Sequence, residues 1–188
     1  MNFQILNIIV YGNNGKKRSI DLIPNCVNII TGQSQTGKSA LIHIVDYCLG
    51  RKDCNIPAGI IRKNVSWYAV KLQITSSEIF IARKTPEKGK ESSEHIYFER
   101  GTHITLPDIQ SLVKNTNLET LNILLSEVLG TNDYSYEPEP GKTRKTGKAD
   151  IGKALIYCFQ EQSEIDDQKF LFHRQGEPFV PQSIKDYL

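Results

Sequence analysis

The sequence of 188 residues lacks any long hydrophobic run and has little excess charge of either sign. No apolar stretch approaches the roughly 20 residues that a membrane-spanning helix needs. Met1 leads into polar residues and not into a basic and then apolar signal sequence, so we expect a cytoplasmic protein. Because 23 basic and 21 acidic residues leave a net charge of only +2, any contact with nucleic acid would depend on a local cluster of cations.

The sequence also lacks the spacing of metal ligands. The four cysteines stand at positions 26, 48, 54 and 158, without a Cys-x-x-Cys pair and without histidine at ligand spacing. This arrangement argues against a zinc site and against a disulfide framework. Cys26 and Cys158 lie beside apolar segments, and we expect both to be buried, reduced thiols. The remaining composition, 39% hydrophobic and 23% charged, is typical of one globular domain or lobe with a substantial core.

The most informative motif is Gly-Gln-Ser-Gln-Thr-Gly-Lys-Ser at 32–39, which fits the phosphate-loop pattern G-x-x-x-x-G-K-[ST]. An apolar segment at 27–30 predicts a strand before it, and the apolar periodicity of 40–49 predicts a helix after it. In this order backbone N–H groups surround phosphates, Lys38 reaches the β and γ phosphates, and Ser39 binds Mg²⁺. The predicted nucleotide-binding residues are Gly32, Gln33, Ser34, Gln35, Thr36, Gly37, Lys38, Ser39 and Ala40.

Turn residues between β-branched segments predict antiparallel hairpins on both sides of this motif. The first hairpin turns at 12–15, and its lysines and arginine at 16–18 form either a solvated edge or a contact to bound phosphates. The later strands form an antiparallel insertion, with turns expected near Ser76-Ser77 and Arg100-Gly101. The expected strands are 3–10, 18–23, 65–74, 78–84, 95–99 and 102–106.

Helical and loop signals dominate the rest of the chain. A helical region begins at 107–114, and Thr116 with Glu119 forms a capping box for a second helix that Gly130 ends. The polar stretch 131–148 predicts a long loop, and the apolar run 154–159 a buried strand or the end of a buried helix. Cations in the loop could bind a nucleic-acid backbone or remain solvated; they are Lys142, Arg144, Lys145 and Lys148.

These landmarks together resemble the N-terminal lobe of the SMC-like ATPases, an ABC-type group of P-loop proteins. The segment 32–57 is similar to a bacterial family of such ATPases described as a domain of unknown function. The resemblance implies an α/β fold of α+β character, with a mixed sheet around the phosphate loop and an antiparallel β insertion. The implied parts are 1–50 with the loop and its helix, the insertion 51–106, a helical part 107–130, a basic loop 131–150, and 151–188 with a glutamine loop and a beginning helix.

The resemblance also implies a role for Gln162. The family's glutamine loop reads Gln, a small residue, an acidic or amide residue and an apolar one, and Gln162-Ser163-Glu164-Ile165 fits this pattern. By resemblance, Gln162 would touch Mg²⁺ and the attacking water, with Gln160 as the alternative. Catalysis of ATP hydrolysis would then involve Lys38 and Gln162.

Two departures from the family pattern limit what it implies. The family's loop has Asn-Gly in its middle and a hydroxyl residue after the serine, where this chain has Ser34-Gln35 and Ala40. The sequence also contains no signature loop of the Ser-Gly-Gly type and no apolar strand ending in Asp-Glu. The resemblance therefore implies half of an ATPase head, binding ATP and Mg²⁺ but needing a C-terminal lobe or a second ATPase protomer for hydrolysis.

Three functions remain open at this point. The first is the ATP-binding half of an SMC-like head, for which the resemblance suggests DNA maintenance or defence. The second is a P-loop phosphotransferase acting on a small molecule, although no acceptor site or lid arginine is evident. The third is a nucleotide-gated module without turnover that binds DNA or a protein through the basic loop. The choice between adenine and guanine is open as well.

Overall fold

The computed structural model describes residues 3–130, 135–136, 147–148, 151–166, 169, 171–178, 180–181 and 184. At 135–136, 147–148 and 162–163 it describes the backbone alone. The chain divides into two compact units, Met1–Leu121 and Asn122–Leu188. The boundary falls within helix α3 (Leu118–Leu129).

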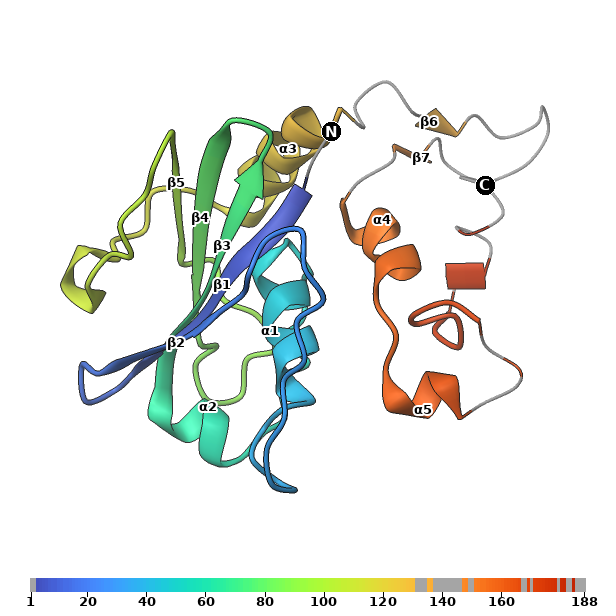
Figure 1. Ribbon diagram of the computed structural model, residues 1–188, viewed down its shortest axis with the longest axis horizontal. Coiled ribbons are helices and arrows are strands. Elements are labelled where there is room, and N and C mark those ends of the chain that lie inside the picture. Colours follow the sequence, from blue (N-terminus) through green and yellow to red (C-terminus); the bar gives the residue numbers. More distant parts are fainter. Residues whose placement is uncertain are drawn as a thin grey trace. The chain divides into compact units, whose positions relative to one another are not determined.

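The first unit is built on one five-stranded sheet, in the order β2-β1-β3-β4-β5, in which every neighbouring pair is antiparallel (Figure 1). The predicted hairpin turns at 12–15 and near Ser76 are confirmed, because Gly15 adopts a φ of 78° in the first and the second closes with Ile74 opposite Ser77. The strands are β1 (Phe3–Gly12), β2 (Lys17–Asp21), β3 (Val65–Ile74), β4 (Ser77–Lys84) and β5 (Ile96–Gly101).

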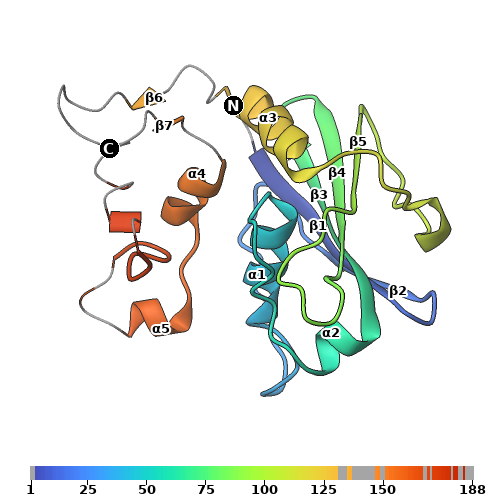
Figure 2. The same cartoon turned by 180° about the vertical axis from the view of Figure 1, so that it is seen from behind.

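Both faces of this sheet are covered, because the alternation of side chains along each strand sends apolar groups to either side. Helix α1 (Ala40–Cys48) packs on one face, where the ring of Tyr47 meets that of Tyr68 at 6.3 Å. Figures 1 and 2 show the short 3-10 helix η1 (Ile109–Ser111) on the side away from α1. The core on that other face consists of Ile9, Tyr11, Trp67, Ala69, Phe80, Ala82, Ile104 and Leu112.

The predicted mixed sheet is wrong. Among the described residues the five-stranded sheet contains no parallel pair, and the segment 27–30, expected as the strand before the phosphate loop, belongs to no strand. Val27 and Ile29 are 91% and 81% exposed. Branched apolar residues favour strands only where a neighbouring strand supplies hydrogen bonds and a packing surface, and within the described chain nothing pairs with this segment. The unit is therefore an α+β fold.

Two further predictions in the 95–114 region are also wrong. Arg100-Gly101 lies inside β5 and not in a hairpin turn, and 102–106 is not a strand. The backbone N–H of Ile104 donates instead to Oε2 of the buried Glu78, at 2.5 Å. The expected helical region at 107–114 contains only the 3-10 helix η1. The N–H of Ser111 bonds to the carbonyl three residues before it, that of Asp108, which is the 3-10 and not the α-helical pattern.

The predicted helix after residue 116 is confirmed as α3, but its predicted cap is not. Asn117 caps the helix through Oδ1, which accepts from the N–H of Thr120 at 2.9 Å. Thr116 forms an isolated bridge with Ile96 instead. Leu121 and Leu125 are buried, as their spacing predicts.

The cysteines differ from expectation in their exposure. Cys26 and Cys158 are exposed, while Cys48 and Cys54 are buried, and all four are free thiols. Cys26 is exposed because the segment beside it is not a strand of the sheet.

The second unit contains helices α4 (Ile151–Cys158) and α5 (Gln162–Ile165) and a two-residue ladder of β6 (Ser135–Tyr136) with β7 (Gly147–Lys148). The apolar run at 154–159 is thus mainly helical. A small hydrophobic cluster in the second unit consists of Ile156, Val180 and Ile184, with Phe172 packed beside them. Within the described residues, no helix combines the length and apolar character that crossing a bilayer requires.

Candidate phosphate-binding site

The loop at 32–39 leads directly into α1, as the sequence predicts. Two of its residues have positive φ, Gln35 at 63° and Gly37 at 87°, whereas Thr36 and Lys38 do not. Ser39 is already in the right-handed helical region, with φ −63° and ψ −24°. In anion-binding nests, left- and right-handed residues alternate so that successive backbone N–H groups turn toward one side; the positive φ values at 35 and 37, with residues of negative φ between and after them, are of this kind. The local backbone therefore suits phosphate.

Lys38 is folded back over this loop. Its Nζ donates to the carbonyl oxygens of Gly32 at 2.8 Å and Gln33 at 2.6 Å. The hydroxyl of Thr36 also donates to the carbonyl of Gln33, at 2.8 Å. These bonds tie the Lys38 ammonium group to the backbone of the loop. An anionic oxygen placed there would meet a fixed cation as well as the N–H groups of the nest.

Ser39 and Ala40 form the junction with the helix. Ser39 occupies the N-cap position, but its exposed hydroxyl makes no capping hydrogen bond. It is therefore available as a ligand for Mg²⁺, which usually takes only one or two protein oxygens together with phosphates and waters. Ala40 is buried, and its N–H already donates to the carbonyl of Gly37 at 3.0 Å, so it offers no free donor.

Helix α2 (Ile60–Asn64), which the sequence did not predict, lies against the loop. Gly37 is favoured by its φ of 87°, and Cδ1 of Ile61 is 3.3 Å from the place that a Cβ on residue 37 would occupy, so a larger residue would also have to displace that side chain slightly. The hairpin turn of the first strand pair holds the far end of α2. There Asn13 donates through its N–H to the carbonyl of Asn64 and through its side chain to that of Lys63, at 2.8 and 2.7 Å.

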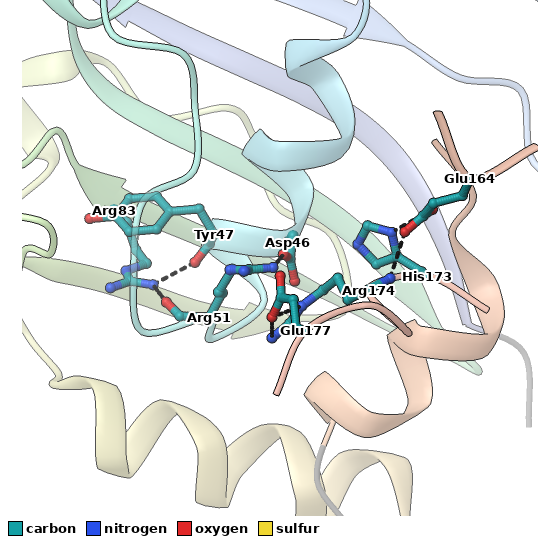
Figure 3. A network of polar contacts seen from close by, with 8 residues as sticks. All are labelled: Asp46, Tyr47, Arg51, Arg83, Glu164, His173, Arg174 and Glu177. Carbon is teal, nitrogen blue, oxygen red and sulfur yellow. Dashed lines mark hydrogen bonds and ion pairs between the residues drawn. The ribbon is translucent and has the colours of Figure 1, made fainter. Parts of the chain in front are cut away.

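A buried arginine fixes the other end of α1 (Figure 3). Arg83 of β4 is fully buried and donates to the carbonyls of Tyr47 at 2.6 Å and Arg51 at 2.5 Å, with its guanidinium 3.7 Å from the centre of the Tyr47 ring. Burial lowers the pKa of Arg83 from its usual value. Asp46 and Arg51 form a second buried contact there, an ion pair of 2.8 Å.

Sequence reasoning missed this anchor. The sequence does contain one signal for a buried arginine. Side chains two residues apart on a strand share a face, and Arg83 follows the buried Ile79 and Ile81 on the same face of β4. The anchor matters for the site because α1 positions the loop at its opposite end.

The glutamine-loop segment lies in the second unit. Gln162 is the first residue of α5, and its side chain is outside the described atoms. The carboxylate of Glu164 accepts from the N–H groups of Glu161 and Arg174, at 2.7 and 2.6 Å, and contacts Nδ1 of His173 at 3.0 Å (Figure 3). Burial acts to raise the pKa of Glu164, but these bonds outweigh it and hold the pKa below its usual value. Glu164 is therefore a structural cap for the segment.

Gln160 donates to the carbonyl of Leu171 at 3.2 Å. Lys17 bonds to Asp108 and to the carbonyl of Leu106, and none of its described bonds is to the phosphate loop. In the basic loop, Lys142, Arg144 and Lys145 lie outside the described residues, and Lys148 is described only as part of the β7 backbone. The DNA contact of this loop stays a prediction.

Clustered metal ligands do not occur in the described part of the chain: no three histidine, cysteine, aspartate or glutamate side chains are grouped so that they could hold an ion. Comparison of the chain with protein-family models, with curated proteins and with solved structures gives no match. The resemblance to SMC-like ATPases therefore stays a prediction, and the functional argument depends on the loop itself.

Proposed function

We propose that this protein binds ATP with Mg²⁺ through the loop at 32–39. The observation that carries the proposal is the combination of alternating φ at 35–38 with the Lys38 ammonium tied to the backbone of the same loop. Backbone N–H groups would hold the phosphates, Lys38 would neutralise the β and γ oxygens, and the free Ser39 hydroxyl would bind the metal.

We further propose that hydrolysis needs groups from a partner, either a complementary ATPase lobe or a second protomer. The sequence supports this, because it contains neither a signature loop nor an apolar strand that ends in a catalytic carboxylate. Apolar side chains just before the phosphate loop are also exposed, and a partner would cover them; they are Ile23, Val27, Ile29 and Ile30.

Calorimetric titration of the chain with ATP, with and without Mg²⁺, tests the binding proposal. We expect saturable binding that Mg²⁺ strengthens and that Lys38→Ala reduces at least tenfold, since a charge-assisted contact is lost. Lys88→Ala is the matched control, because Lys88 is an exposed lysine far along the chain from the loop. Binding that Lys38→Ala leaves unchanged would contradict the proposal.

Phosphate release separates binding from turnover. We expect the chain alone to hydrolyse ATP very slowly, because the water-activating carboxylate has to come from the partner. Rapid, Lys38-dependent hydrolysis by residues 1–188 alone would contradict the partner requirement while leaving the binding site in place.

A further inference from the structure

Gln35 has the least favourable backbone conformation of the phosphate loop. Its φ of 63° lies in the left-handed region, where the Cβ of an ordinary residue crowds the following carbonyl oxygen. The same loop uses glycine at its other left-handed position, 37. Most positive φ values elsewhere in the described chain also belong to glycine, namely at Gly15, Gly50, Gly59, Gly89 and Gly130.

The protein's own contacts do not compensate for this conformation. Gln35 is exposed, and within the described chain no hydrogen bond to its carboxamide is found. The neighbouring polar groups satisfy one another instead, since both Thr36 and Lys38 donate to the carbonyl of Gln33. A long side chain with a free amide donor therefore stands at the beginning of the nest, at a position where glycine would be less strained. Unfavourable backbone conformations that the surrounding structure maintains cluster at active sites and ligand-binding loops.

We propose that the Gln35 carboxamide donates a hydrogen bond to an oxygen of the bound polyphosphate. The inference rests on the proposed function and adds a side-chain contact to the backbone contacts of the loop. An amide suits this position because it provides a donor without a second positive charge beside Lys38. Gln35 is then a residue that sets affinity for the phosphate chain.

Three substitutions at one position separate the side-chain contact from the backbone strain. Gln35→Gly removes both, Gln35→Ala removes only the contact, and Gln35→Glu keeps the length but places a carboxylate against phosphate. We expect ATP affinity, measured by calorimetry with Mg²⁺, to fall about tenfold for Gln35→Gly and for Gln35→Ala, as expected for a lost hydrogen bond to a charged group. Gln35→Glu should fall further, and part of that extra loss should disappear at high salt.

Thr75→Gly is the matched control. Thr75 has a φ of 50° in the turn between β3 and β4, so its replacement by glycine relieves the same kind of strain away from the loop. We expect both glycine variants to raise the urea midpoint of unfolding, but only Gln35→Gly to weaken ATP binding.

The outcomes distinguish this inference from the function on which it rests. Absence of ATP binding by the unaltered chain would overturn both. Normal ATP binding by Gln35→Gly and Gln35→Ala, or equal binding by Gln35→Glu and the unaltered chain, would overturn the Gln35 contact alone.

Discussion

At the scale of single residues, Arg83 shows how a full charge is accommodated in this core. Among the described residues no carboxylate forms an ion pair with its guanidinium; the partners are backbone carbonyls, the hydroxyl of Ser92 and the face of the Tyr47 ring. The Tyr47 carbonyl belongs to the last turn of α1, the negative end of the helix dipole, which favours a cation. Within the described part of the chain Nε has no hydrogen-bond partner, so the arrangement depends on the two terminal nitrogens.

Replacement of this arginine tests the anchor. We expect Arg83→Met to lower the free energy of unfolding by about 2–4 kcal/mol, because several buried carbonyls lose their donor even though the volume is kept. Urea denaturation measures the change. Arg100→Met on β5 is the control, since Arg100 is exposed and its replacement should cost under about 0.5 kcal/mol. Equal stability of the Arg83→Met and Arg100→Met variants would contradict the anchoring role.

The sequence names the residues of the candidate phosphate loop, whose binding of phosphate stays a prediction, but it does not name the Arg83 anchor. The glycines, Lys38 and Ser39 follow from a fixed spacing whose chemistry is local. The bonds of Arg83 to Tyr47 and Arg51 join positions 32 to 36 residues apart, and only the fold brings those positions together.

At the scale of secondary-structure elements, local signals succeeded where the partner is close in sequence. Hairpins β1–β2 and β3–β4 and helices α1 and α3 agree with their turn residues and apolar spacing. The segments 27–30 and 102–106 look equally strand-like, but pairing and side-chain contacts decide otherwise. In 102–106, the N–H of Ile104 donates to the Glu78 carboxylate and not to a neighbouring strand. Helix α2 was missed because five residues carry too little periodicity to detect.

The start of α3 offers a test at this scale. We expect Asn117→Ala to lower the free energy of unfolding by about 1 kcal/mol, because the first turn loses the acceptor for the Thr120 N–H. Thermal or urea denaturation followed by circular dichroism measures this. Thr116→Ala removes the cap that the sequence pattern favours and should change stability less. A larger loss for Thr116→Ala than for Asn117→Ala would place the cap at residue 116 after all.

At the scale of the whole molecule, the chain divides into a sheet-containing unit with the phosphate loop and a helical unit with Gln162. The first unit has its own two-sided core, yet exposes apolar residues along 23–30. Under the proposed function, a partner that docks beside the candidate phosphate loop would cover these residues.

Two alanine substitutions, one in the segment 23–30 and one in the sheet core, test by their effect on the free energy of unfolding whether that segment lies outside the core. Ile29→Ala should change the free energy of unfolding by less than about 0.5 kcal/mol, because the side chain is already in water. Ile9→Ala should cost about 2–5 kcal/mol, because Ile9 is fully buried in the sheet core. A cost above about 2 kcal/mol for Ile29→Ala would show that the segment is packed and would contradict the exposed arrangement.

The unpaired connection from β2 to α1 has a consequence for how the chain tolerates breaks. Strand β1 is held to β3 over a ladder from Phe3 to Gly12, and α1 is held by Arg83, so neither depends on the covalent link between them. Residues 24–31 are exposed and contribute no strand pairing. Within the first unit, a protease should therefore cut there before it cuts the paired strands, and the two fragments should remain associated. The same stretch is the place where a foreign peptide could be inserted with the least damage to the sheet.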